Sequence, residues 1–193
     1  INEEIKLAAN LVKYTSLEIC SEYKRTIRIN DNDSDNYDII HPLLLAKNIY
    51  KTNSDVYIYT TPKTKTIGYR FKCQLSENAK ILSNLNFVPE MNHNEIEGYG
   101  NLNSSYRVIL WLSDSHDLDE NIKNINNSYK IINSNNNEQV TLKSYNLSFK
   151  NLPFISGQYL LLYYLDWVSF YLAMLFRTDP TPVNSITKLK NMG

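Results

Sequence analysis

A glutamate and a histidine, Glu77 and His93, lie on one polar stretch, "QLSENAKILSNLNFVPEMNHNEI". A positioned carboxylate can shuttle a proton between neighbouring substrate carbons. The imidazole titrates near neutral pH, and the flanking Asn92 and Asn94 could fix its tautomer. Two groups with different pKa values can divide acid and base work, so the pair indicates general acid–base chemistry. The alternatives are an exposed helical glutamate and a histidine at a helix start with no role.

The segment "DPTPV" and the helix expected after it carry the other candidates. Pro180 and Pro182 restrict the residues before them to extended conformations, so Thr181 is held at a defined angle ahead of the final helix. That helix, "VNSITKLKNM", contains Lys188 and Lys190. The alternative for either lysine is a solvated charge at a helix end, which the helix dipole favours.

The elements that must position these residues alternate between helices and strands. Apolar residues at helical spacing predict a helix over Asn2–Tyr23, and Pro42 is tolerated in the first turn of a helix over His41–Lys51. Further helices are predicted at 119–132, Phe154–Arg177 and 183–192. Aromatic and β-branched runs predict strands at Asp55–Thr61, Arg107–Leu112 and Gln139–Tyr145, with the second of them central. This order predicts an α/β fold, a three-layer α/β/α domain with a mainly parallel sheet of about five strands.

The segment Phe154–Arg177 is apolar enough to raise the question of a membrane span. Its centre contains Asp166, and a charged side chain at the centre of a bilayer is costly. The sequence therefore favours a long core helix packed on the sheet, with no membrane partner. Inside a folded domain, Asp166 needs a buried partner or a cleft.

Length, charge and cysteine content limit the class of protein. The chain has 193 residues, enough for one domain with a substantial core. Lys plus Arg and Asp plus Glu both number 20, which argues against a nucleic-acid partner. Cys20 and Cys73 have no metal-ligand spacing, so neither a metal nor another cofactor is expected. No export signal is present at the start of the chain, so a cytoplasmic protein is expected.

The order of five segments resembles the bifunctional phosphoglucose/phosphomannose isomerases of the sugar isomerase (SIS) superfamily. The resemblance spans about His41 to Lys190, and "ENAK", "NHNE" and "DPTPV" are together its most specific part. The segments are "GYRFKCQLSENAK", "PEMNHNEIEGY", "RVILWL", "YLDWVSFYLAMLF" and "DPTPVNSITKLK".

The resemblance implies a role for each candidate. Glu77 matches the base that moves a proton between C1 and C2 through a cis-enediol. His93 matches the histidine that helps to open the sugar ring, which in the family is donated by the neighbouring subunit of a dimer. Thr181 matches the threonine that lets the C2–C3 bond rotate, so that mannose phosphate is also accepted. The ring-opening lysine is Lys188, by its separation from Thr181, or Lys190, by the "LK" ending of the family.

The chain departs from the family in one respect. The family has two SIS subdomains, and the first holds the sugar phosphate with a glycine-rich turn and a serine/threonine loop. This chain has five glycines and neither feature. It therefore resembles the C-terminal SIS domain, at 36–193, preceded by a linker helix and polar loop at 1–35, with the N-terminal SIS half as a missing partner.

Two functions follow from the resemblance. In the first, the chain is part of an aldose–ketose isomerase that interconverts glucose 6-phosphate or mannose 6-phosphate and fructose 6-phosphate, and the fragment alone is weak or inactive. In the second, it is a non-catalytic SIS module that binds sugar phosphate or serves in dimerisation or regulation. Retention of all the candidate residues favours the first.

Overall fold

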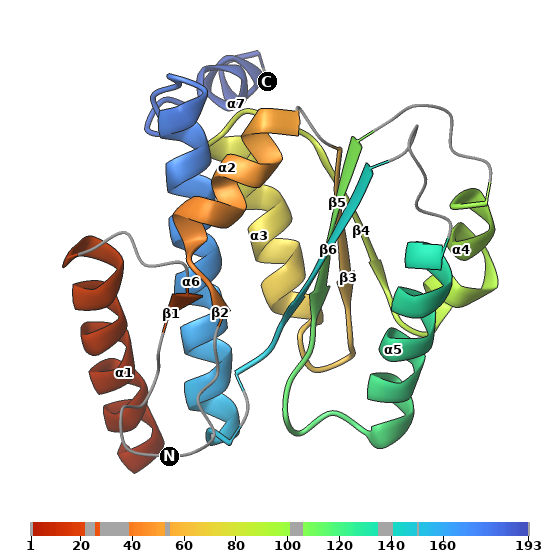
Figure 1. Ribbon diagram of the computed structural model, residues 1–193. Coiled ribbons are helices and arrows are strands. Elements are labelled where there is room, and N and C mark those ends of the chain that lie inside the picture. The colour runs from red at the N-terminus through yellow and green to blue at the C-terminus, as the bar shows by residue number, and fades with distance from the viewer. Residues whose placement is uncertain are drawn as a thin grey trace.

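The structure, a computed structural model, describes residues 2–21, 26–27, 39–52, 55–100, 106–134, 141–149 and 151–192 (Figure 1). The helices are α1 (Asn2–Ser21), α2 (Pro42–Thr52), α3 (Lys65–Glu77), α4 (Glu95–Gly98), α5 (Asp119–Ser134), α6 (Phe154–Leu175) and α7 (Asn184–Lys190), with a 3-10 helix η1 (Glu90–His93). The strands are β1 (Thr26–Ile27), β2 (Ile39–Ile40), β3 (Asp55–Thr60), β4 (Ser83–Phe87), β5 (Tyr106–Leu112) and β6 (Thr141–Leu147).

The main sheet is fully parallel, in the order β4-β3-β5-β6. Strand β5 lies between two neighbours, which confirms that the "RVILWL" run is central. The described part of the chain gives this sheet four strands, where about five were expected. The remaining described strands, β1 and β2, have two residues each and pair with one another in antiparallel fashion, so neither extends the main sheet.

Strand β4 was not predicted, because its sequence "SNLNF" is polar. It lies at the edge of the sheet and pairs with β3 from Val56↔Ser83 to Thr60↔Phe87. The side chain of Asn84 is exposed there. An edge strand needs only one neighbour for its backbone hydrogen bonds, and polar side chains are common at sheet edges. Pairing with β3 therefore makes a strand of a segment that lacks a strand-like pattern.

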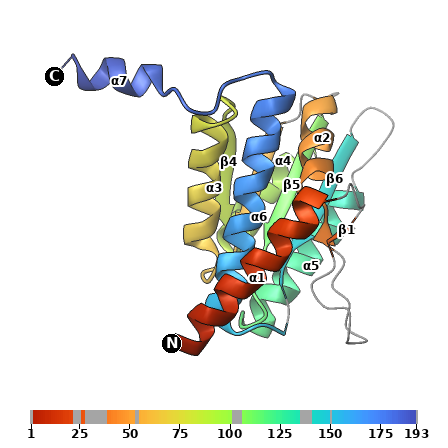
Figure 2. The same ribbon diagram turned by 90° about the vertical axis from the view of Figure 1, so that its left-hand side faces the viewer.

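Helices cover both faces of the sheet, which confirms the three-layer α/β/α architecture. Helices α2, α3 and α6 lie on one face, with α1 packed outside α6, while α4 and α5 lie on the other (Figures 1 and 2). We call these the α3 face and the α4 face. Alternate strand residues supply the two cores. Val56, Ile58, Val108 and Leu110 belong to the core of the α3 face, and Tyr59, Ile109 and Trp111 to that of the α4 face.

Helix α3 is held closely against the sheet. At its start, the hydroxyl of Thr64 donates to the carbonyl oxygen of Leu112 at 2.7 Å, which ties the helix to the end of β5. Along its length, a Cβ added at Gly68 would come within 2.3 Å of the Thr60 side chain. Only glycine allows this approach of α3 to β3. The helix that ends at Glu77 is therefore fixed relative to the sheet.

Helix α6 packs on the sheet as expected and also contacts α3. Asp166 finds its partners there, since its carboxylate accepts hydrogen bonds from Gln74 Nε2 at 2.6 Å and from Arg70 Nη2 at 3.3 Å. The Asp166 side chain is 35% exposed, so this carboxylate and its two partners lie at the rim of the core and not within it. Among the described helices, none is both long and apolar enough to cross a membrane.

Candidate functional site

Glu77 is the last residue of α3 and lies at the amino edge of the sheet, which is uppermost in Figure 1. The chain leaves β3 at the carboxyl edge and runs back along α3, so the helix ends where the strands begin. The side chain of Glu77 is exposed, and its carboxylate has no hydrogen-bond partner in the described part of the chain. It is therefore free to accept a proton from a ligand.

A cavity of about 560 Å³ opens beside Glu77. Its walls come from the end of α3, from Lys80, and from Thr178, Asp179 and residues 182–186. Lys80 holds the two walls together, because its Nζ donates to the carbonyl oxygen of Pro182 at 2.8 Å and also to that of Glu77. The structure thus brings the "ENAK" and "DPTPV" segments to one place.

Lys80 was missed as a site residue in the sequence, although it is the lysine of "ENAK". Its backbone has a φ of 59°, in the left-handed region, which takes the chain sharply away from α3 and toward β4. A side chain at this turn can reach the segment after α6. No sequence pattern predicts the contact between Lys80 and Pro182. The only hint that Lys80 belongs to the site was its place in the "ENAK" motif.

Thr181 lies in the wall segment but is not one of the cavity-lining residues. Its backbone N–H donates to Asp179 Oδ1 at 2.9 Å, and its side chain is exposed. The neighbours Asp179 and Pro182 both line the cavity. The turn therefore places Thr181 at the rim.

The two candidate lysines lie further away. Helix α7 extends from the body of the protein (Figure 2), and all of its residues are exposed. Ile186 in its first turn lines the cavity, whereas Lys188 and Lys190 do not. The structure does not bring either lysine to Glu77 within the chain.

His93 lies at the other edge of the sheet. It ends η1, which follows the carboxyl end of β4, and its side chain is exposed. Strand β4 alone has five residues and spans about 16 Å. Glu77, which precedes this strand, and His93, which follows it, are therefore not brought into one site by the fold of a single chain.

The asparagines beside His93 are engaged elsewhere. Asn92 Oδ1 accepts from the Ser128 hydroxyl at 2.7 Å, and Asn94 Oδ1 accepts from the backbone N–H of Glu95 at 2.6 Å. No hydrogen bond joins either side chain to the imidazole in the described part of the chain. The interpretation that they fix its tautomer is therefore not supported by the geometry.

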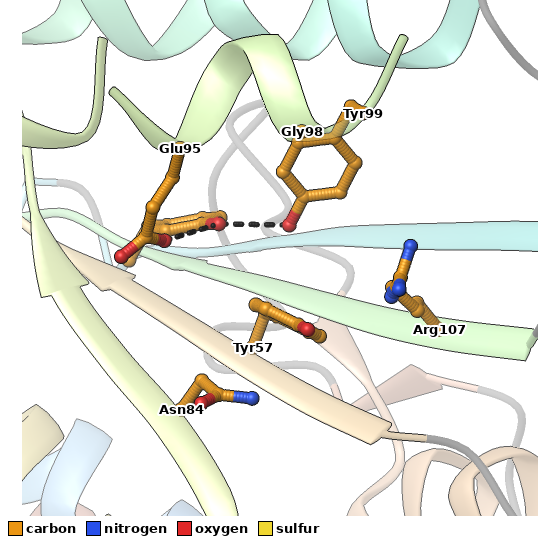
Figure 3. Close-up of a pocket in the computed structure, with 7 residues that line it drawn as sticks. Tyr57, Asn84, Glu95, Gly98, Tyr99 and Arg107 are labelled. Carbon is orange, nitrogen blue, oxygen red and sulfur yellow. Dashed lines mark hydrogen bonds between the residues drawn. The ribbon is translucent and has the colours of Figure 1, made fainter. Parts of the chain in front are cut away.

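A second polar cluster lies on the α4 face (Figure 3). The Tyr59 hydroxyl donates to Glu95 Oε2 at 3.0 Å and lies 2.7 Å from the Tyr99 hydroxyl. Asn86 Nδ2 donates to the other carboxylate oxygen of Glu95 at 2.7 Å. Burial, and next the neighbouring Tyr99, raises the pKa of Tyr59 well above its ordinary value, and burial also raises the pKa of Tyr99. Both hydroxyls are therefore harder to ionise than the hydroxyl of a tyrosine in water.

This cluster borders a separate cavity of about 280 Å³. Tyr57, Tyr59, Tyr99, Glu95 and Arg107 line it together with Asn84 and Gly98. No site was expected here from the sequence. The alternating tyrosines of "DVYIYT" were its only signal, since they put both rings on one face of β3. No group of three or more potential metal-ligating side chains occurs in the described ranges.

Three comparisons relate this chain to known proteins. The family described as "Bacterial phospho-glucose isomerase C-terminal SIS domain" matches residues 42–192. The bifunctional phosphoglucose/phosphomannose isomerase of Aquifex aeolicus is 32% identical over 135 residues, which are 69% of this chain and 40% of that protein. Its namesake in Thermoplasma acidophilum is 31% identical over 152 residues, 76% of this chain and 44% of that protein.

Solved structures show the same fold. A putative sugar-phosphate isomerase from Listeria monocytogenes superposes with a TM-score of 0.61, covering 100% of this chain and 94% of that one, at 9% sequence identity. The chain spans less than half the length of the two isomerases named above. The match over 42–192 and the identity to those isomerases show that the chain belongs to the family of bacterial phosphoglucose isomerase C-terminal SIS domains.

Proposed function

We propose that this chain forms the catalytic C-terminal SIS domain of an isomerase that interconverts glucose 6-phosphate or mannose 6-phosphate and fructose 6-phosphate. The observation that carries the proposal is the free carboxylate of Glu77 beside the cavity formed with Asp179 and residues 182–186. Two relatives, 32% and 31% identical to this chain, bear the name of that activity. In this proposal, the chain from residue 36 onward is the SIS domain, and residues 1–35 link it to an N-terminal half that holds the phosphate.

The chemistry assigned to Glu77 is proton transfer between C1 and C2 of the open-chain sugar. From the aldose, the carboxylate takes the proton from C2, a cis-enediol forms, and the same carboxylate returns the proton to C1, while a second proton passes from O2 to O1 to complete the ketose. An exposed carboxylate with no protein partner can approach both carbons in turn. Thr181, at the rim of the cavity, is assigned to the rotation about C2–C3 that admits mannose phosphate.

His93 is assigned to ring opening in the active site of a second copy of the chain. The sheet separates it from Glu77 of its own chain, so a shared site needs a homodimer in which each copy supplies one group to each site. The ring-opening lysine, Lys188 or Lys190, is on the projecting helix α7, which has no buried residue. Helix α7 must therefore dock against another part of the enzyme before its lysine can act.

The first test replaces Glu77 by glutamine in the longest natural protein that contains this sequence. Glutamine keeps the size of the side chain but cannot accept the carbon-bound proton, and loss of a general base lowers the rate by about 10²–10⁴-fold. Turnover of fructose 6-phosphate is followed in a coupled assay, and substrate affinity should stay within a few-fold. Glu120→Gln, at another exposed glutamate, is the matched control. Near-normal turnover of Glu77→Gln would refute the assignment, and binding without turnover in the wild type would favour the non-catalytic module.

The second test mixes two inactive variants, Glu77→Gln and His93→Ala. A dimer with one copy of each has one site with both groups intact if His93 crosses the interface. Random exchange of subunits should then restore about a quarter of the wild-type activity, because half the dimers are mixed and each has one intact site. If Glu77 and His93 of the same chain formed a site, every site in every dimer would lack one group, and no activity would return.

A further inference from the structure

The cavity on the α4 face is distinct from the one beside Glu77. It lies between α4 and the strands β3, β4 and β5, across the sheet from α3 (Figure 3). We call it the tyrosine pocket, after Tyr57, Tyr59 and Tyr99. Its volume of about 280 Å³ is near the lower end of the range for small-molecule sites. The pocket plays no part in the isomerase chemistry proposed above.

One end of the tyrosine pocket is cationic. The Nε atom of Arg107 is buried and has no hydrogen-bond partner in the described part of the chain. The guanidinium carbon lies 5.5 Å from the centroid of the Tyr57 ring, so the charged group packs over an aromatic face. A buried donor without an acceptor is destabilising. An oxygen of a bound anion would supply the missing acceptor.

The opposite end accepts hydrogen bonds. Figure 3 shows Glu95 and Arg107 far apart, with the Tyr57 and Tyr99 rings between them. Each oxygen of the Glu95 carboxylate accepts one hydrogen bond from the protein, and a carboxylate oxygen has capacity for a second. The rings of Tyr57 and Tyr99 are 6.1 Å apart at 65°, which gives the middle of the pocket an apolar wall.

We propose that the tyrosine pocket binds a small hydroxylated carboxylate, such as a sugar acid. The ligand's carboxylate accepts from Arg107, its hydroxyl groups donate to Glu95, and its C–H faces lie against the tyrosine rings. The pocket has one cation and one carboxylate, so a single guanidinium must balance the ligand. A monoanion suits this arrangement better than a phosphate dianion, which would leave uncompensated charge near Glu95.

The test is an NMR titration of the full chain with D-gluconate. Gluconate should bind saturably and shift the backbone amides of Gly98 and Tyr99 and the side-chain Nε–H of Arg107. D-glucose, which lacks the charge, and acetate, which lacks the hydroxyl groups, should shift these signals at least tenfold less at the same concentration. Equal shifts from acetate, tighter binding of glucose 6-phosphate at these residues, or no shift from gluconate would overturn the proposal.

Two variants test the site itself. Arg107→Gln should weaken gluconate binding at least tenfold, because the cation is lost. Gly98→Leu should abolish binding, because a Cβ at Gly98 meets no atom within 4 Å and the added side chain has room to fill the pocket. Gly100→Leu is the matched control, since Gly100 lies outside this pocket and its Cβ would meet only the Glu97 carbonyl oxygen, at 3.4 Å. Unchanged binding in Arg107→Gln would refute the assignment even if Gly98→Leu failed to fold.

Discussion

The two faces of the sheet are built differently. On the α3 face the strands contribute Val56, Ile58 and Leu110, which pack under long helices in a core of apolar side chains. On the α4 face they contribute Tyr59 and Trp111. Hydrogen bonds link the Tyr59 hydroxyl to Glu95 and Tyr99. Helix α3 has 13 residues and α4 has four. Glu77, the candidate base, is the last residue of α3. The tyrosine pocket lies on the α4 face, beside the hydrogen bonds of Tyr59.

The difference shows how each helix is kept in place. Apolar burial is non-directional and proportional to area, so the α3 face is stabilised by close packing over a long helix. A four-residue helix buries too little to be stable by itself. Helix α4 instead depends on its cap, Asn94, and on the hydrogen bonds of Glu95 to Tyr59 and Asn86. Mutations should therefore act through side-chain volume at α3 and through hydrogen bonds at α4.

The largest effect on stability is expected from Phe71→Ala on the α3 face. Phe71 is 1% exposed, and truncation of a buried phenylalanine lowers the free energy of unfolding by about 3–5 kcal/mol. Tyr69→Ala, on the same helix, is the control, because Tyr69 is 62% exposed and its loss should cost less than about 0.5 kcal/mol. Urea unfolding followed by circular dichroism measures both. Similar effects of the two variants would show that α3 is not packed as described.

The same small change, glycine to alanine, should destabilise the protein on the α3 face but not on the α4 face. Gly68→Ala forces a Cβ into the Thr60 side chain and should lower the free energy of unfolding by about 1–3 kcal/mol. Gly98→Ala meets no atom within 4 Å, and Gly98 does not have a positive φ. It should be neutral or should stabilise by up to about 1 kcal/mol. Thermal unfolding of the two variants compares them directly, and equal melting temperatures would contradict the close approach of α3 to β3.

On the α4 face, Tyr59→Phe removes a hydroxyl and almost no volume. Glu95 and Tyr99 then each lose a hydrogen-bond partner in a buried setting, so the free energy of unfolding should fall by about 1–3 kcal/mol. Tyr57→Phe is the control, because the Tyr57 hydroxyl makes no hydrogen bond to any described residue. If both variants were as stable as the wild type, the polar network would not hold α4 in place.

The smallest effect is a dependence of stability on alkaline pH. The pKa of Tyr59 is raised in the folded protein, so below about pH 10 this tyrosine is protonated in both the folded and the unfolded states. Above that pH it ionises only in the unfolded state, and the free energy of unfolding falls as pH rises, by at most about 1.4 kcal/mol per pH unit. Urea unfolding between pH 9 and 11 should show a smaller loss for Tyr59→Phe. An identical pH dependence in wild type and variant would argue that Tyr59 is exposed to solvent.

The sequence by itself determined most of the elements and the identity of the candidate base. The aromatic and β-branched runs of β3 and β5 and the long apolar segment of α6 can satisfy their hydrogen bonds and bury their side chains in few other ways. Asp166 was expected to need a partner because burial of an unpaired charge is costly, and it has two on α3. Glu77 was singled out by its motif, since its residue type and its neighbours are local properties of the chain.

Tertiary structure alone decided which of these residues meet. Strand β4 exists because β3 offers backbone partners to a polar segment, and that strand puts Glu77 and His93 at opposite edges of the sheet. Lys80 reaches Pro182, more than 100 positions away in the sequence, because a left-handed turn aims it there. Arg107 and Glu95 line one pocket because three strands and a short helix converge. Such contacts depend on how elements pack in space, and local sequence patterns carry no record of that packing.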